Sequence, residues 1–216
     1  MTDEQSVFIV DDDDAVRDAL GMLVRSIKLK AREFASAEEF LDAYDPDQPG
    51  CLITDVCLPG TDGLGLQQIL KERNISIPII VISGHGDIPM SVHMVREGAL
   101  DFLEKPFKNH HVLQRIREAL HHDARRREQA RSTADIRERY TSLTPREKQV
   151  ADLLVEGAPN KVIASRLNLS TRTVEAHRAT VMRKMGVRSA PALTLRLMQL
   201  ADEGADPSGN AHAPVT

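Results

Sequence analysis

Tryptophan is absent from this sequence, and only 3% of its 216 residues are aromatic. Proteins that hold single-stranded nucleic acid without sequence preference stack the bases on aromatic side chains, so this scarcity argues against such a role. No stretch approaches the about 18 apolar residues that a membrane-spanning helix requires. The first residues, MTDEQ, are acidic and do not begin a secretion signal. We therefore expect a cytoplasmic protein that does not contact a membrane.

Cysteine is scarce as well. Cys51 and Cys57 are the two cysteines, six residues apart around a predicted strand. An extended chain separates such residues by roughly 20 Å, which is too far for a disulfide. We expect two reduced thiols.

Charge is distributed unevenly along the chain. Residues 1–107 hold 9 Lys/Arg against 20 Asp/Glu, a net charge of −11. Residues 108–140 hold 9 against 5, and residues 141–200 hold 10 against 4, giving +4 and +6, while the last 16 residues add −3. An acidic first half and a basic second half indicate two domains with different partners, and a polyanion is a natural partner for the second.

The first half alternates short apolar runs with amphipathic stretches. The runs predict strands at 7–10, 30–34, 51–54, 79–82 and 101–104, with the one at 30–34 at an edge. The stretches between and after them predict helices at 14–27, 36–44, 64–73, 88–97 and 109–121. This alternation is typical of the α/β class, and it predicts a (βα)5 doubly wound parallel sheet of the flavodoxin-like order within residues 1–121.

The second half predicts helices only. Residues 122–140 are charged and free of Pro and Gly, which predicts a solvated linker helix that extends the preceding one. Residues 141–201 predict an all-α domain of four short helices. Thr144 and Glu147 form a capping box at the start of the first helix. Ser170 is the N-cap of the third helix, which ends before Gly186. Two short helices, a turn and a longer helix make a helix-turn-helix. The small, polar tail 202–216 is expected to be disordered.

Polar side chains follow four of the predicted strands at their carboxyl ends, where open α/β sheets bind ligands. Carboxylates suit Mg²⁺, a hydroxyl and an ammonium can bind phosphoryl oxygens, and a carboxylate can itself become an aspartyl phosphate. Each residue has an ordinary structural alternative as a turn former, a cap or a surface charge, but together they indicate a Mg²⁺-dependent phosphoryl site. The residues are Asp11 and Asp12, Asp55, Ser83 and Lys105.

Several motifs in the first half now point to a family. The segments IVDDDDAVR, LITDVCLPGTDG, VISGHGD and FLEKPF resemble the receiver domain of bacterial two-component response regulators. The segments LTPREKQVADLLVEG, NKVIASRLNLSTRTVEAHR and VMRKMGVRS resemble the LuxR-type DNA-binding domain. The combination, with GHGDIPM and EKPF, is similar to the FixJ subgroup of the NarL/FixJ regulators. The resemblance spans residues 5–200.

The resemblance implies roles for the strand-end residues. Asp55 would accept a phosphoryl group from the phosphohistidine of a sensor histidine kinase. Ser83 and Lys105 would bind the phosphoryl oxygens, the Lys105–Pro106 bond would be cis, and Phe102 would be the aromatic that moves when the hydroxyl is drawn inward. The Mg²⁺ ligands would be Asp11, Asp12, Asp55 and the backbone carbonyl of Cys57.

Three positions depart from the family pattern. Ser83 stands where many relatives carry Thr, Asp62 where a small Ser is frequent, and Gly65 where an acid is common. These departures leave the rate of phosphotransfer and the choice of kinase open, but not the mechanism.

The run of four aspartates divides under this interpretation. Asp11 and Asp12 form the Mg²⁺ pair, whereas Asp13 and Asp14 begin the first helix, where a negative side chain is favoured by the helix dipole. An alternative is a haloacid-dehalogenase-type phosphatase, in which Asp12 is the nucleophile and Asp14 the acid/base. The later paired acidic motif of that superfamily is missing.

The third helix of the basic domain carries the predicted DNA-reading face. Val174, His177, Val181 and Met185 recur at helical spacing and predict the side that packs in the core. The opposite side, with Arg172, Ala176, Ala179 and Arg183, would enter a major groove with its arginines on phosphates. The LuxR-type resemblance implies that Glu175, Ala176 and Ala179 stand at the base-reading positions. The candidate DNA contacts are Asn160, Lys161, Arg172, Thr173, Glu175, Ala176, Arg178, Ala179 and Arg183.

The expected function is that of a bacterial transcription regulator that catalyses only its own phosphorylation and dephosphorylation. Phosphorylation would promote a homodimer. The dimer would bind a double-stranded promoter operator and activate transcription together with RNA polymerase. The last helix would contribute Leu193, Leu197 and Leu200 to the dimer. A binding-only regulator that is never phosphorylated is the second alternative, although every catalytic side chain is present.

Overall fold

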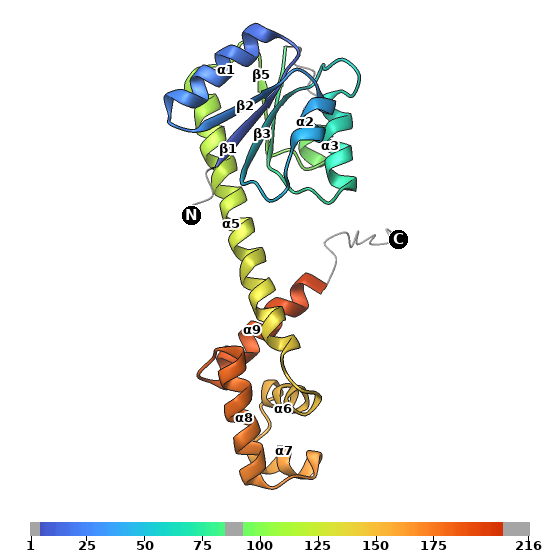
Figure 1. Ribbon diagram of the computed structural model, residues 1–216, viewed down its shortest axis with the longest axis vertical. Coiled ribbons are helices and arrows are strands. Elements are labelled where there is room, and N and C mark those ends of the chain that lie inside the picture. The colour runs from blue at the N-terminus through green and yellow to red at the C-terminus, as the bar shows by residue number, and fades with distance from the viewer. Residues whose placement is uncertain (1–4, 85–92, 205–216) are drawn as a thin grey trace, which may run out of the picture. The chain divides into compact units, whose positions relative to one another are not determined.

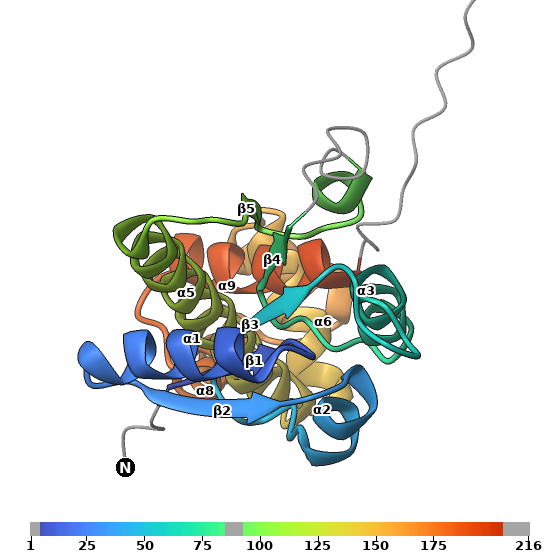
Figure 2. The ribbon, with the colours of Figure 1, turned by 90° about the horizontal axis from the view of Figure 1, so that it is seen from above.

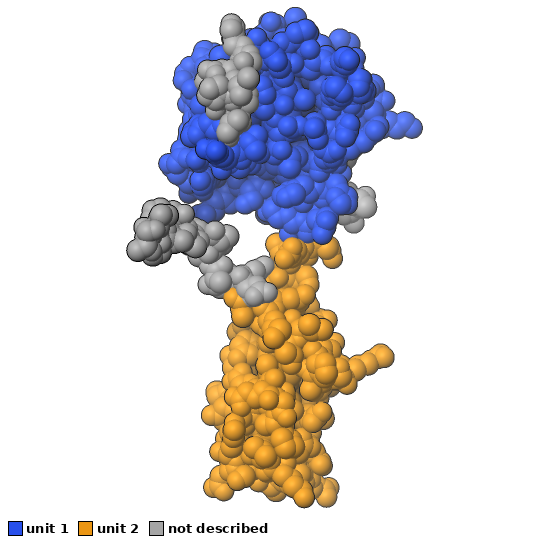
Figure 3. Space-filling view, turned by 180° about the vertical axis from the view of Figure 1, so that it is seen from behind, with its two compact units in different colours: residues 1–127 blue, residues 128–216 orange. Residues whose placement is uncertain are grey.

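The structure is a computed structural model, and it describes residues 5–84 and 93–204. The chain divides into two compact units, residues 1–127 and 128–216, which are coloured separately in Figure 3. The domain boundaries expected from the sequence, at 121 and 141, stay a prediction.

The first unit is built on one parallel sheet (Figure 1). Its strands are β1 (Ser6–Val10), β2 (Lys30–Phe34), β3 (Gly50–Asp55), β4 (Ile79–Ser83) and β5 (Asp101–Glu104). They lie in the order β2-β1-β3-β4-β5, and every neighbouring pair is parallel. This is the flavodoxin-like order, so the predicted fold is confirmed. β1, β3 and β4 are buried throughout, as continuous apolar runs require.

Helices cover both faces of this sheet (Figure 2). α1 (Asp14–Ser26) and α5 (Asn109–Thr141) cover one face, and α2 (Ala37–Ala43) and α3 (Gly63–Glu72) cover the other. Alternate strand residues feed the two cores, with Phe8 on the side of α2 and Ile9 on the side of α1. Within the predicted helix 88–97, residues 93–96 are helical and 88–92 lie outside the described residues.

Side-chain caps fix where two of these helices begin. Asp13 is the N-cap of α1, because its carboxylate accepts the backbone N–H of Ala15 at 2.8 Å. Asp62 is the N-cap of α3 and accepts the N–H of Gly65 at 2.7 Å. Two of the departures from the family pattern are therefore partners in one cap, which gives both a local structural role.

The second unit is helical and encloses its own core. Its helices are α6 (Pro145–Val155), α7 (Asn160–Leu167), α8 (Thr171–Met185) and α9 (Ala190–Gly204). The predicted capping box of Thr144 and Glu147 is present, and Gly186 ends α8 with φ 63°, a value that favours glycine. α9 runs three residues past the predicted end of the domain, and residues 205–216 of the expected tail lie outside the described residues.

α5 continues through the predicted linker as one helix of 33 residues. The predicted linker is not solvated throughout. Asp123 is fully buried in the first unit, and Ile136 is buried in the core of the second. No helix in the described part of the chain is long and apolar enough to cross a membrane.

The capping box at the start of α6 gives the first testable prediction. Thr144→Ala removes the hydroxyl that accepts the N–H of Glu147, which should lower the free energy of unfolding of the second unit by about 1 kcal/mol. Denaturant unfolding of the full chain, followed by a probe in α6, measures this change. Thr144→Ser keeps the hydroxyl and serves as the control. An equal loss in both variants would contradict the capping role.

Candidate functional site: an acidic cluster and an exposed helix face

The predicted phosphoryl-site residues meet at one end of the sheet. Asp11 directly follows β1, Asp55 and Ser83 are the last residues of β3 and β4, and Lys105 directly follows β5. Because all these strands are parallel and adjacent, their carboxyl ends lie at the same edge. The register places Asp55 beside Ile82, the residue before Ser83. Residues 85–92 of the predicted motif segments lie outside the described residues.

Lys105 joins the two buried carboxylates of this cluster. Its Nζ lies 2.7 Å from Oδ2 of Asp11, and it also forms a hydrogen-bonded ion pair with Oδ2 of Asp55. The side chain of Asp11 is 2% exposed and that of Asp55 is 9% exposed. Charges at such depth are stable only when they are paired and hydrogen-bonded, and one ammonium here serves two carboxylates.

Backbone N–H groups hold the second oxygen of each carboxylate. The N–H of Asp13 donates to Oδ1 of Asp11 at 3.0 Å, and the N–H of Cys57 donates to Oδ1 of Asp55 at 2.9 Å. Each carboxylate thus has one oxygen on a backbone donor and the other on Lys105. The orientation of both groups is set by the chain itself.

The electrostatics of the cluster show a surplus of negative charge. Burial raises the pKa of the Asp11 carboxyl, Lys105 acts in the opposite direction, and the charge of Asp55 raises it further. Burial disfavours the Lys105 ammonium, yet its hydrogen bonds to both carboxylates raise its pKa. A second cation near these oxygens would relieve the repulsion between Asp11 and Asp55.

The remaining predicted metal ligands lie at the surface. Asp12 and Cys57 are exposed. Both cysteines, the exposed Cys57 and the buried Cys51, are free thiols, as expected. Within the described residues, no three His, Cys, Asp or Glu side chains already form a metal-binding group. The structure therefore brings Asp11 and Asp55 together and leaves Asp12 outside that pair. The donor set of carboxylates and a backbone carbonyl still suits Mg²⁺.

The predicted switch residues lie beside the cluster. Ser83 is buried, and its carbonyl accepts the N–H of Lys105 at 2.7 Å, which ties β4 to the lysine. Phe102, on β5, is half-buried and packs against the core on the side of α2 and α3. The Lys105–Pro106 peptide bond is cis, as the resemblance implied.

α8 of the second unit presents the predicted DNA-reading face to solvent. Val174, Val181 and Met185 are buried as predicted, whereas His177 is only half-buried, so the core stripe is narrower than the spacing suggested. Among the predicted contacts on α8, the exposed ones are Arg172, Glu175, Ala176, Ala179 and Arg183. Such a face, with small residues between two arginines, can approach a major groove closely.

The other predicted contacts include a linked pair. Arg178 donates through Nη1 to Oδ1 of Asn160 at 3.1 Å, which connects α8 to the first residue of α7. Thr173 serves the cap of α8, because its N–H donates to Oγ of Ser170 at 3.0 Å. Lys161 is exposed.

The apolar face of α9 differs from the prediction. Leu193 is fully buried in the core of its own unit, and Leu197 and Leu200 pack against the same core. The expected dimer contact is therefore wrong for Leu193, whereas for the half-buried Leu197 and Leu200 it stays a prediction. The exposed apolar side chains of α9 are Leu195 and Met198, at 66% and 56% exposure.

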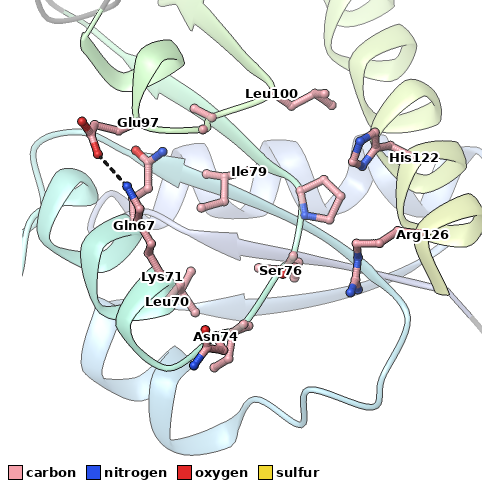
Figure 4. A pocket seen from close by; sticks show the side chains of 15 residues that line it. Gln67, Leu70, Lys71, Asn74, Ser76, Ile79, Glu97, Leu100, His122 and Arg126 are labelled. Atoms are coloured by element: carbon pink, nitrogen blue, oxygen red, sulfur yellow. Dashed lines mark hydrogen bonds and ion pairs between the residues drawn. The ribbon is translucent and has the colours of Figure 1, made fainter. Parts of the chain in front are cut away.

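A cavity of about 510 Å³ lies at the opposite ends of the strands from the acidic cluster (Figure 4). It is lined by the start of β4, the turn before β5, and side chains of α3 and α5, including Leu70, His122 and Arg126. Lys71 and Glu97 form an ion pair at its edge, 3.2 Å apart. None of the residues predicted to carry function lines this cavity.

Comparison with known proteins agrees with this geometry. Residues 7–117 match the response regulator receiver domain, and residues 141–197 match the bacterial regulatory proteins of the luxR family. The chain belongs to the FixJ-like response regulators of the NarL/FixJ family. This response regulator is 45% identical to the response regulator protein TodT of Pseudomonas putida, over 94% of this chain and 89% of that protein.

Two further relatives cover nearly the whole response regulator. It is 41% identical to the transcriptional regulatory protein FixJ of Azorhizobium caulinodans, over 98% of this chain and 99% of that one. The solved structure of the response regulator StyR matches with a TM-score of 0.84 and 39% identity, over 91% of this chain and 99% of that one. A receiver domain implies a histidine kinase partner, and a LuxR-type domain implies DNA binding. This response regulator is accordingly a two-component transcriptional regulator and not an enzyme in the usual sense.

Proposed function

We propose that Asp55 is the phosphoacceptor of this response regulator and that its phosphorylation controls DNA binding by the second unit. The observation that carries the proposal is the bridge that Lys105 makes between the buried carboxylates of Asp11 and Asp55. Lys105 and the N–H of Cys57 hold the Asp55 carboxylate in one orientation at the carboxyl end of the sheet. A fixed carboxylate beside a cation is suited to phosphoryl transfer, which depends on positioning and charge stabilisation.

In the proposed reaction, a carboxylate oxygen of Asp55 attacks the phosphorus of a phosphohistidine on the kinase. A P–O bond forms as the P–N bond breaks, and the departing imidazole nitrogen takes up a proton from water. Lys105, already within hydrogen-bonding distance of Asp55, offsets the charge on the phosphoryl oxygens, and the Ser83 hydroxyl donates a hydrogen bond to one of them. The product is an aspartyl phosphate.

The proposed Mg²⁺ ligands are Asp11, Asp12, Asp55 and the backbone carbonyl of Cys57. Bound there, the ion supplies positive charge that offsets the repulsion between the carboxylates and the incoming phosphoryl group. Asp11 is buried and its carboxylate is oriented by the N–H of Asp13, so it would offer the ion a carboxylate oxygen at a fixed place. Asp12 is exposed and can turn its carboxylate toward the same place.

Phosphorylation adds negative charge, which can shift the equilibrium between two conformations of the receiver surface. We propose that Ser83 is drawn toward the phosphoryl group, that Phe102 moves with it, and that the altered receiver forms a homodimer. α8 would then enter successive major grooves of a promoter operator, and RNA polymerase would be the next partner. For the second unit, the proposed dimer contact on α9 consists of the half-buried Leu197 and Leu200 together with the exposed Leu195 and Met198.

Phosphorylation by acetyl phosphate with Mg²⁺ tests this function. The wild type should gain both dimer fraction and affinity for an operator selected from random-sequence DNA, by about tenfold in affinity, a usual size for coupling between two sites. Sedimentation and fluorescence anisotropy measure the two changes. Asp55→Asn is nearly isosteric and serves as the control. If Asp55→Asn responds as strongly as the wild type, Asp55 is not the switch.

A further inference from the structure

Asp123 is a buried charged residue that the sequence placed in a solvated linker. It lies on α5 in the first unit, and its exposure is 0%. A carboxylate at such depth is costly unless its oxygens are hydrogen-bonded and its charge is matched. Its partners therefore show what this part of α5 is held against.

Three donors satisfy the two oxygens of Asp123. Oδ2 accepts the backbone N–H of Gly50 at 3.0 Å and Nε of Arg127 at 2.8 Å, and Oδ1 accepts Nη2 of Arg126 at 2.8 Å. Gly50 is the first residue of β3, and a Cβ there would lie 2.1 Å from the carbonyl oxygen of Ser6, so only glycine is tolerated. The contact thus attaches α5 to a strand start that is itself tightly packed.

Arg127 extends this attachment to the loop before β3. Its guanidinium donates to three successive backbone carbonyls, those of Pro46 at 2.8 Å, Asp47 at 3.0 Å and Gln48 at 2.8 Å. The side chain is 15% exposed. A planar guanidinium has several donors in a fixed arrangement, so one Arg can hold a loop in a way that a Lys cannot. We call Asp123, Arg127 and Gly50, with the loop at 46–48, the β3 anchor.

The β3 anchor connects two elements that matter for signalling. β3 begins at Gly50 and ends at Asp55, the proposed phosphoacceptor. α5, which carries Asp123 and Arg127, continues without interruption to Thr141. If α5 could bend freely at residues 122–127, a conformational change in the receiver would not move the rest of the helix. Because charged groups hold α5 to the receiver there, such a change can move the helix as a whole.

We propose that Asp123 and Arg127 are positioning residues that fix the base of α5 on the phosphoacceptor strand, so that a change of state at Asp55 reaches the DNA-binding unit through α5. This inference rests on the proposed function, since it needs DNA binding that responds to phosphorylation. It predicts that loss of the β3 anchor separates phosphorylation from its effect on DNA binding while leaving each in place.

Adjacent arginines provide a matched pair of variants. Arg127→Ala removes the contacts with the loop at 46–48 and one partner of Asp123. Arg126→Ala removes the same charge and the other partner of Asp123, but none of the loop contacts given by Arg127. Both full-length variants are labelled with acetyl phosphate, and operator affinity is measured with and without labelling. The ratio of the two affinities is the quantity compared.

Arg127→Ala should be labelled at Asp55 at the wild-type rate, while its affinity ratio falls below about twofold from the wild-type value of about tenfold. Amide exchange at Gly50 should be faster, because the acceptor of its N–H is less firmly held. Arg126→Ala should keep at least half of the wild-type ratio. If Arg127→Ala is unfolded at the assay temperature, Arg127→Gln is used instead. Gln keeps part of the aliphatic side chain and an N–H hydrogen-bond donor.

The outcomes separate this inference from the proposed function. A wild-type ratio of one refutes the proposed function. A wild-type ratio well above one that persists in Arg127→Ala, with faster exchange at Gly50, overturns the inference alone and reduces the β3 anchor to a stabilising contact. Equal losses in Arg126→Ala and Arg127→Ala would also overturn it, because the loop contacts would then not matter.

Discussion

Asp12→Ala should reduce Mg²⁺-dependent phosphorylation of Asp55 by at least about 100-fold, whereas Asp14→Ala should leave it nearly unchanged. A 100-fold loss corresponds to about 2.7 kcal/mol in the barrier, which is within the several kcal/mol that a bound metal ion contributes to charge stabilisation. Labelling by acetyl phosphate across a Mg²⁺ titration measures both the rate and the Mg²⁺ requirement.

The reason lies in what each aspartate already does in the fold. Asp11 is paired with Lys105, Asp13 caps α1, and Asp14 forms an ion pair with Arg17 on the surface of α1. Asp12 is exposed, and no ion pair or hydrogen bond of its side chain is found within the described residues. Its carboxylate is therefore available for a cation.

Asp14→Ala is the matched control, because it removes the same charge two residues away. It should cost at most about 1 kcal/mol of stability, since an exposed ion pair and a charge at a helix N-terminus are each worth less than that. Equal losses of phosphorylation in both variants would show that the aspartate run is divided at the wrong place. The phosphatase alternative would require Asp14 to matter as much as Asp12.

The sheet and the acidic cluster could be predicted because their signals are local. Buried parallel strands are continuous apolar runs, and the residue after each run falls at the same edge of the sheet, which predicts that Asp11, Asp55 and Lys105 lie together. What the sequence could not supply was the bridge itself, in which Lys105 is hydrogen-bonded to both carboxylates and Asp12 is left exposed.

The predictions that failed concern side chains that could either pack inside their own unit or face outward. Leu193 recurs with Leu197 and Leu200 at helical spacing, but the structure buries Leu193 in the core of its own unit, where a second copy cannot contact it. Asp123 lies in a charged stretch that looks solvated, because its buried position depends on Gly50, 73 residues away. Only a long-range contact distinguishes a buried aspartate with two arginines from a surface cluster of the same composition.

Ala179→Glu should lower operator affinity by about 100-fold. Ala179 is exposed on α8 between Arg172 and Arg183, on the face proposed to enter the major groove. A carboxylate there would lie among DNA phosphates, where like charges cost several kcal/mol, and it would also fill space that a methyl group leaves open. Anisotropy titrations of phosphorylated protein with the selected operator measure the loss.

Gln149→Glu is the matched control for this charge. Gln149 is exposed on α6, and a carboxylate at this position can still accept the hydrogen bond from Nη1 of Arg146, which is 2.9 Å in length. Its effect should stay below about twofold, as expected for one charge outside the interface. Because Ala179 lies on the solvent face, Ala179→Glu should also unfold at the same denaturant concentration as the wild type. A folded Ala179→Glu variant that binds the operator as tightly as Gln149→Glu would mean that another face of the second unit reads DNA.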